Sequence, residues 1–260
     1  MIGLGFRREM ADWDLSAIGA DFFEVVPENW VRRDRSPLHA IIAGGRPVHL
    51  HGVSMNLGGT SPISSEFLRE LRGLIDDLGA TRYSDHLAAS GDAHQLYDLF
   101  PIPFTEAEVA RVADRIRRVQ DGLGRRMAVE NSTWYSNTGT MPEADFLAAV
   151  VERADCDILL DLNNIRVNHK NHGTGDLRDF IARIDLGRVS YLHVAGHEFD
   201  ARFDLHIDTH SQPVEAPTAA MARELQRTHG LAILLEWDND LPDAGTIREE
   251  LACLRPSTTT

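Results

Sequence analysis

The chain has 260 residues, close to the roughly 250 of a (β/α)8 barrel, and its 43% hydrophobic and 25% charged content is that of an ordinary globular protein. Its formal net charge of −14 would repel phosphate backbones and acidic membrane surfaces, which argues against nucleic acid as a partner. Two isolated cysteines, together with the lack of an apolar run near the ~20 residues that span a bilayer, favour a cytoplasmic protein that does not enter a membrane.

Short apolar runs alternate along the chain with longer amphipathic stretches, the pattern of a parallel sheet covered by helices. The runs predicted to be strands are residues 2–6, 22–26, 47–51, 81–86, 127–130, 157–161, 189–194 and 232–236. Apolar residues at three- and four-residue spacing predict helices at residues 66–78, 105–122, 143–154, 177–184, 218–229 and 246–254. The sequence therefore predicts an α/β fold, a single (β/α)8 TIM barrel over residues 1–255 with a disordered tail at 256–260.

Four connections that follow predicted strands are longer than a simple turn requires. They are residues 52–65, 88–104, 131–142 and 166–175. A barrel places its chemistry at the C-terminal ends of its strands. We therefore expect these connections to form a binding surface.

Imidazole and carboxylate side chains stand at the C-terminal ends of six consecutive predicted strands. With the connections that follow, they make a set of nine: His51, His86, Glu130, Asp161, Asn164, His193, Asp208, His210 and Glu236. One such residue alone would be interpreted as part of a hydrogen-bonded core. Four buried carboxylates without counter-charge would each cost several kcal/mol, and no comparable set of Lys or Arg accompanies them. The set predicts two or three metal ions that share bridging carboxylates.

The order of these residues is similar to the trinuclear site of the apurinic endonuclease and xylose isomerase-like barrel superfamily, where histidine is usual at the Asn164 position. More closely, the segments HGVSMNLGG, YSDHL, DLNNIRVN, HVAGH, DTHSQPV and EWDND resemble the multinuclear non-heme iron-dependent oxidases. That family includes the methanobactin-biosynthesis oxidase and was formerly a domain family of unknown function. The resemblance runs from Gly3 to about Leu241.

This resemblance implies an enzyme that uses dioxygen and two or three irons, mixed Fe(II) and Fe(III), to modify cysteine residues of a ribosomally synthesised precursor peptide in natural-product biosynthesis. It also implies a heterodimer with a partner protein that recognises the leader of the precursor. The implied ligands are His51, His86 and Glu130 for a first metal, Glu130, Asp161, His193 and Glu236 for a second, and Asn164, Asp208 and His210 for a third.

Three further residues near the strand ends are candidates for orienting ligands or moving protons. They are Asp238, His197 and Asp85, and Asp238 is the preferred general base. Each could equally be a structural hydrogen-bonding residue.

Polar residues of the long connections are candidates for contacts with a peptide backbone. They are Asn56, Asn131, Asn168 and His172. Turn formation is the alternative explanation for the asparagines. Arg166 stands where the family usually has an aromatic residue, and it predicts a precursor with acidic residues near its reacting cysteine.

Two other functions could use the same nine positions. A zinc metallohydrolase acting on abasic DNA or another phosphodiester is opposed by the net charge and by the single lysine, Lys170. A sugar isomerase or epimerase usually needs a lysine or histidine to move protons, and Lys170 would be the only lysine available. Colour separates these possibilities, because ferric iron absorbs visible light and zinc does not.

Overall fold

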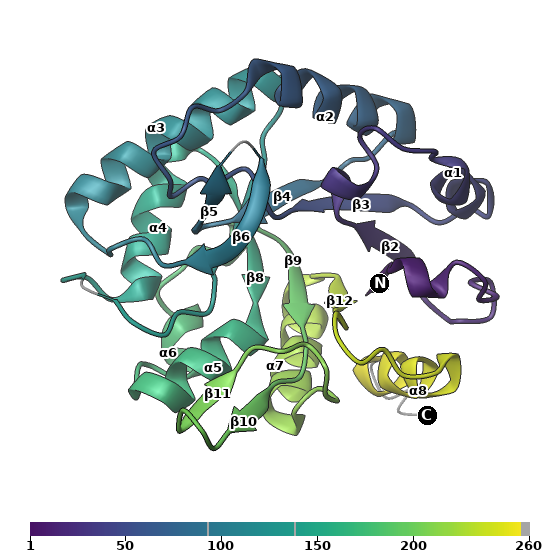
Figure 1. The fold of residues 1–260 in the computed structure, drawn as a ribbon. Coiled ribbons are helices and arrows are strands. Elements are labelled where there is room, and N and C mark those ends of the chain that lie inside the picture. The colour runs from purple at the N-terminus through teal and green to yellow at the C-terminus, as the bar shows by residue number, and fades with distance from the viewer. Residues whose placement is uncertain (93, 138, 256–260) are drawn as a thin grey trace.

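Eight parallel strands close into a barrel in the computed structural model, which describes residues 1–92, 94–137 and 139–255 (Figure 1). Around the barrel the order is β1, β2, β3, β4, β7, β8, β9 and β12, which returns to β1. Their bounds are β1 (Ile2–Gly5), β2 (Phe22–Val25), β3 (Val48–Gly52), β4 (Tyr83–His86), β7 (Ala128–Glu130), β8 (Asp157–Asp161), β9 (Val189–Val194) and β12 (Ile233–Leu235). The predicted TIM barrel is confirmed, and the predicted tail at 256–260 lies outside the described residues.

The helices surround the barrel, as Figure 1 shows. They are α1 (Ser36–Ala43), α2 (Ser65–Leu78), α3 (Glu106–Leu123), α4 (Glu143–Ala154), α5 (Leu162–His172), α6 (Leu177–Ile181), α7 (Ala216–His229) and α8 (Ala244–Leu254). Three short 3-10 helices lie at Arg8–Met10, Pro27–Asn29 and Leu186–Arg188. Six α-helices coincide with predicted ones to within a few residues. Among the described residues, none of the helices is both long and apolar enough to cross a membrane.

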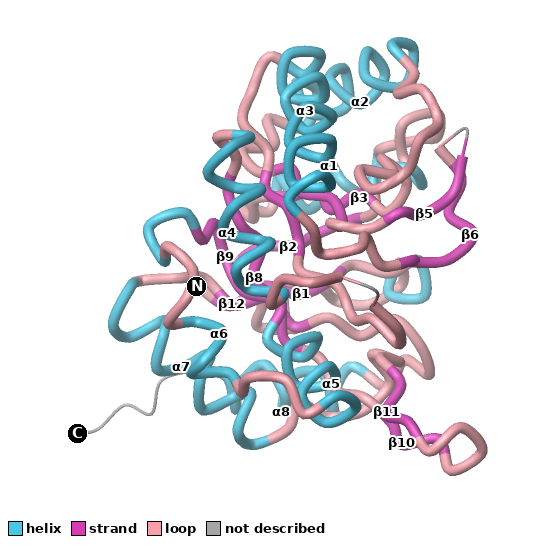
Figure 2. The backbone as a smooth tube through the Cα atoms, turned by 90° about the vertical axis from the view of Figure 1, so that its left-hand side faces the viewer, coloured by secondary structure: helices cyan, strands magenta, loops and turns pink. Residues whose placement is uncertain are grey.

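The long connections contain regular structure that the sequence analysis did not predict. Helix α5 occupies most of the expected loop at 166–175 and begins directly after β8, where the Asp161 carboxylate accepts a hydrogen bond from the Asn164 N–H at 2.6 Å. Its asparagine-rich sequence hides the weak apolar pattern, although Leu162 and Ile165 are fully buried. Two antiparallel hairpins, β5 (Ala89–Asp92) with β6 (Gln95–Phe100) and β10 (Glu198–Asp200) with β11 (Leu205–Ile207), project from the same side of the barrel (Figure 2).

Alternate residues of each strand face the barrel interior, where they form two layers. An apolar layer separate from the main core between strands and helices consists of Phe22, Ala128, Leu159, Tyr191, Ala232 and Leu234. Two residues further along the strands, the same face carries Glu24, Glu130, Asp161, His193 and Glu236, all buried. Because side chains alternate with a period of two, the polar layer lies directly above the apolar one, at the C-terminal ends of the strands.

Candidate metal centre

Glu130 stands between two groups of potential metal ligands. Its Oε2 atom lies 3.0 Å from Nε2 of His51 and 3.1 Å from Nε2 of His86. Its Oε1 atom lies 3.5 Å from Nδ1 of His193, which is 3.0 Å from Oε2 of Glu236. Within each of two groups, the ligand atoms all lie within 4.8 Å of one another: His51, His86 and Glu130 in one, and Glu130, Asp161, His193 and Glu236 in the other. The structure thus brings together the two sets predicted for the first and second metals.

Several buried atoms of these groups lie close to one another but make no hydrogen bond of acceptable geometry among the described residues. They are Nε2 of His51, Oε2 of Glu130, Oδ2 of Asp161 and Nδ1 of His193, and the same holds for Nε2 of His210 beside the second group. Buried polar atoms without partners are costly and therefore rare. Coordination of cations would satisfy these atoms together, so the residues present fit a multinuclear metal site. The donors are nitrogen and oxygen, while the two free cysteines stand outside the set.

The polar layer concentrates negative charge in a buried space. Burial raises the pKa of the Glu130 carboxyl, but the charges of His86 and His51 outweigh it and hold that pKa well below its usual range. Burial lowers the pKa of His51, and the Glu130 carboxylate reverses this and raises the pKa to about 9. Burial and the neighbouring Glu130 charge raise the pKa of Asp161. Positive charge, from protons or metal ions, is what this layer attracts.

The residues predicted to bind a third metal lie beside the second group. Nε2 of His210 is 2.8 Å from Oδ1 of Asp208, and Nδ1 of His210 is 3.4 Å from Oε2 of Glu236. The Thr133 hydroxyl lies 2.7 Å from Oδ1 of Asn164 and 3.2 Å from Oδ2 of Asp208. Asn164 and Asp208 therefore meet through a shared hydroxyl partner, and His210 connects them to Glu236.

A cavity of about 390 Å³ opens above the polar layer. Arg7, Tyr135 and Asp238 line it together with seven of the nine predicted ligands. These seven are His51, His86, Glu130, Asn164, Asp208, His210 and Glu236. Asp161 and His193 lie beneath, both fully buried. The candidate centre is thus open on one side and closed by the barrel on the other.

The amino-acid sequence from residue 1 to 258 matches the model of the family described as "RiPP precursor modification enzyme MbnB/TglH/ChrH", where RiPP denotes a ribosomally synthesised and modified peptide. The chain belongs to this family. The resemblance to the methanobactin-type oxidases is thereby confirmed at the level of the family.

Curated relatives of this family member are similar over nearly their whole length. A UPF0276 protein of Alcanivorax borkumensis is 40% identical, covering 96% of this chain and 88% of the relative. A UPF0276 protein of Neisseria gonorrhoeae is 41% identical, covering 96% of this chain and 92% of the relative.

Solved structures show the same fold at low sequence identity. The 3-keto-D-glucoside 4-epimerase of E. coli has a TM-score of 0.65 at 15% identity, with 97% of this chain and 98% of that chain covered. A xylose isomerase domain-containing protein of Salmonella typhimurium has a TM-score of 0.62 at 12% identity, with 96% and 94% covered. These likenesses confirm the xylose isomerase-like barrel.

Asp238, predicted as a general base, lies between Arg7 and His210 and contacts both. Its Oδ1 accepts a hydrogen bond from Nε of Arg7 at 2.8 Å, and its Oδ2 lies 3.2 Å from Nδ1 of His210. Burial and Glu236 raise the pKa of Asp238, but Arg7 and His210 outweigh them and lower it. The Asp238 carboxylate can orient the His210 imidazole, and it also forms a group of potential metal ligands with His210 and Glu236, whose ligand atoms lie within 4.8 Å of one another. The role as general base stays a prediction.

The other two predicted catalytic residues lie away from the ligand groups. Asp85 is on the opposite face of β4 from His86, and its Oδ2 accepts hydrogen bonds from the Tyr83 hydroxyl at 3.1 Å and the Met55 N–H at 3.2 Å. Burial and the charge of Glu28 raise the pKa of Asp85 to about 8. Strand alternation therefore gives Asp85 a position outside the barrel interior. His197 lies beyond the ligands, against α5.

The predicted peptide-binding residues make internal contacts, and none of them lines the described cavity. Asn131 exchanges two hydrogen bonds with the backbone of Asp161, and Asn56 accepts one from the Ser90 N–H at 2.9 Å. The others are engaged as well: Asn168 with Trp134 and Glu143, His172 stacked on Trp134, and Arg166 paired with Glu215. Substrate contact by these five stays a prediction, and the geometry gives them a bracing role.

Two residues that the sequence analysis did not single out contact the ligands directly. Oε1 of Glu24 lies 2.9 Å from Nε2 of His193, and its Oε2 accepts a hydrogen bond from the Tyr191 hydroxyl. A glutamate inside the apolar run FFEVV was a usable signal for Glu24. Arg7, which pairs with Glu236 at 3.0 Å, has no comparable local signal.

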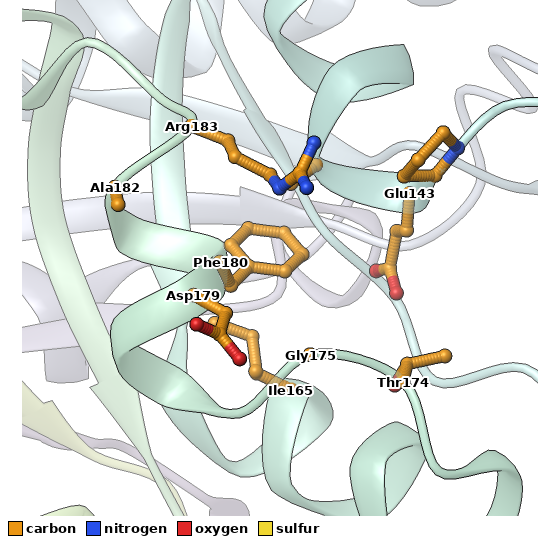
Figure 3. Close-up of a pocket in the computed structure, with 10 residues that line it drawn as sticks. Glu143, Ile165, Thr174, Gly175, Asp179, Phe180, Ala182 and Arg183 are labelled. Carbon is orange, nitrogen blue, oxygen red and sulfur yellow. The ribbon is translucent and has the colours of Figure 1, made fainter.

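A second cavity, of about 670 Å³, lies outside the barrel between α4, α5 and α6 (Figure 3). Ile165, Phe180 and Glu143 line it, and its described lining contains none of the predicted ligands. Glu143 accepts hydrogen bonds from Nε1 of Trp134 at 2.9 Å and from Nδ2 of Asn168 at 3.0 Å. Burial nevertheless raises the pKa of Glu143 to about 7.

We expect Glu143→Gln to raise the free energy of unfolding relative to the wild type at pH 8 by more than it does at pH 5. The native state holds the Glu143 proton more tightly than the unfolded chain, whose pKa is near 4.5, so the stability it contributes below that value is lost as the pH rises to about 7. The carboxyl is only part-buried, which reduces the expected gain at pH 8 to about 1–2 kcal/mol. Urea unfolding of both proteins at the two pH values measures it. An equal difference at pH 5 and pH 8 would contradict the prediction.

Proposed function

We propose that this protein is a multinuclear iron-dependent oxidase that uses dioxygen to modify cysteine residues of a ribosomally synthesised precursor peptide. The observation that carries the proposal is the position of Glu130, whose two oxygens face separate ligand groups. A carboxylate so placed is suited to bridge two metal ions. Membership of a RiPP-modifying family supports a precursor peptide as the substrate.

The imidazoles are oriented so that one nitrogen of each remains for a metal. Nδ1 of His51 lies 2.9 Å from the Ser84 hydroxyl, and Nδ1 of His86 lies 3.2 Å from the Gly52 carbonyl oxygen, which leaves both Nε2 atoms facing Glu130. Glu24 takes the Nε2 side of His193, so that Nδ1 faces Glu130 and Glu236. Such outer contacts fix ring orientation at metal sites.

The proposed ligands are those implied by the family resemblance. His51, His86 and Glu130 would hold a first iron, and Glu130, Asp161, His193 and Glu236 a second. Asn164, Asp208 and His210 would hold a third, and the neutral amide of Asn164 favours partial occupancy there. Bound iron would supply the redox chemistry that dioxygen requires, and the mixed nitrogen and oxygen donors suit that metal.

Metal analysis and oxygen uptake test the proposal. We expect anaerobically purified protein to contain two or more irons per chain, visible in its absorption and Mössbauer spectra. We also expect it, together with its leader-recognising partner, to consume dioxygen with a precursor peptide that contains cysteine, and not with the same peptide carrying Cys→Ser. A colourless, zinc-containing protein that is active would contradict the proposal and favour hydrolysis.

A separate leader-recognising protein is part of this proposal, as the family resemblance implies. We expect removal of that partner to abolish or sharply slow turnover of the full precursor. Full activity with the precursor alone would count against a heterodimer.

A further inference from the structure

A chain of hydrogen-bonded side chains runs from the surface of α5 to Asp208. Lys170, the single lysine of the protein, places its Nζ 2.5 Å from Oε1 of Glu215 and 2.7 Å from Nε2 of His197. Nδ1 of His197 is 2.7 Å from Oδ1 of Asn163, and Nδ2 of Asn163 donates to Oδ1 of Asp208 at 2.6 Å. The chain connects a part-exposed ion pair to a predicted metal ligand.

Each hydrogen bond in this chain has a determined direction. An ammonium group has only donors, so Nε2 of His197 accepts from Lys170. A neutral imidazole that accepts at Nε2 carries its hydrogen on Nδ1 and donates it to the Asn163 carbonyl oxygen. The NH2 group of Asn163 then points to Asp208, which accepts as a carboxylate.

Burial and neighbouring charges keep these hydrogen-bonded side chains in the protonation states just described. The His197 side chain is 2% exposed and Asn163 is fully buried. Burial and the positive charge of Lys170 lower the pKa of His197 to about 4, so the ring is neutral near pH 7. Arg166 contacts the second oxygen of Glu215 at 3.0 Å and leaves the first oxygen to Lys170.

Backbone contacts between α5 and β11 fix the distance between Asn163 and Asp208. The Asn171 amide exchanges two hydrogen bonds of 2.8 Å with the backbone of His206, which holds β11 against α5. Asp208 follows β11 directly. The same helix begins at Leu162, is capped by Asp161 and carries Asn163, so α5 supports both the second and the third predicted ligand sets.

We propose that Lys170, acting through His197 and Asn163, is a positioning residue that holds Asp208 oriented as a ligand for the third metal. His197 connects Lys170 to Asn163. Its role is to present Nε2 to Lys170 as an acceptor and to donate the Nδ1 hydrogen to Asn163. The inference rests on the proposed function only in requiring a metal ion at Asn164, Asp208 and His210.

Anaerobic titration of metal-free protein with Fe(II), with bound iron counted and followed by Mössbauer spectroscopy, tests the proposal. We expect Lys170→Met and His197→Leu to weaken binding of the third ion by about tenfold or more while the first two ions bind as in the wild type, since groups that orient ligands contribute about 10–100-fold to metal affinity. Retention of two ions also shows that each variant has folded. Arg178→Gln is the control, because it removes an exposed ion pair with Glu224 that lies outside these hydrogen-bonded side chains, and it should stay within about threefold of the wild type.

His197→Gln separates positioning from proton transfer. Glutamine accepts at Oε1 from Lys170 and donates from Nε2 to Asn163, so it preserves the direction of the chain. We expect it to restore third-ion binding that His197→Leu loses. Normal third-ion binding in Lys170→Met, or equal loss in both His197 variants, would overturn the inference.

Two results separate this inference from the proposed function. Saturation of the wild type with two ions would overturn the inference and leave a two-iron oxidase standing. Normal Fe(II) titration without cysteine-dependent oxygen uptake would count against the oxidase and leave the positioning chain standing.

Discussion

Glu130→Gln is expected to remove at least one bound metal ion per chain relative to the wild type and to lower turnover by roughly 10³-fold or more. The amide keeps the size of the side chain, but it replaces one of the two oxygens with an NH2 group. Only one of the two ligand groups then finds an oxygen where Oε1 and Oε2 of Glu130 lie in the wild type. The negative charge that draws cations into the polar layer is lost as well.

Metal content by elemental analysis and oxygen uptake with the precursor peptide measure this effect. Glu143→Gln is a matched control, because it makes the same chemical change at a glutamate outside the barrel interior. It should keep the wild-type metal content. An unchanged metal content in Glu130→Gln, with turnover intact, would show that Glu130 does not bridge.

Phe22→Ala is expected to lower the free energy of unfolding by about 3–5 kcal/mol. Phe22 is fully buried in the apolar layer, where the centroid of its ring lies 4.5 Å from the ring centroid of His49 and 6.4 Å from that of Tyr191. A Cβ at Gly3 would lie only 2.3 Å from the Phe22 ring, which shows how completely the ring fills this space. Its removal leaves a void that rigid strands close poorly.

The Phe22 variant should also loosen the site above it. Tyr191, which packs on Phe22, donates its hydroxyl hydrogen to Glu24, and Glu24 faces His193. Denaturant unfolding of the metal-free protein measures the loss of stability. Phe199→Ala is the control, because Phe199 is 55% exposed and its truncation should cost under about 0.5 kcal/mol. A loss below about 1 kcal/mol for Phe22→Ala would mean that this layer is not tightly packed.

Local patterns predicted the strands and most helices because each depends on the period of apolar residues within one segment. The ligand sets followed from the same periodicity. His51, Glu130 and His193 stand at or near strand ends, where a barrel gathers side chains from every strand into one space. Helix α5 was missed because its asparagines obscure the apolar period, and its first turn depends on a cap from Asp161.

The asparagines show where sequence patterns stop being informative. Asn131 and Asn168 were predicted to contact peptide, which stays a prediction, and the structure shows that both are buried and hold neighbouring segments together. An amide that braces a core and an amide that binds a substrate have the same local sequence signal. Only their partners differ.

The sequence by itself determined the barrel, the family and the residues that gather at the strand ends, because periodicity and motif order are carried by neighbouring residues. Only the tertiary structure decided what each of these residues faces. Arg7 meets Glu236 and Asp238 across separations of 229 and 231 residues, because β1 and β12 close the barrel side by side. Lys170 reaches Asp208 through two buried side chains, because α5 packs against β9 and β11. Such contacts arise from chain closure and packing, which leave no periodic trace in the sequence.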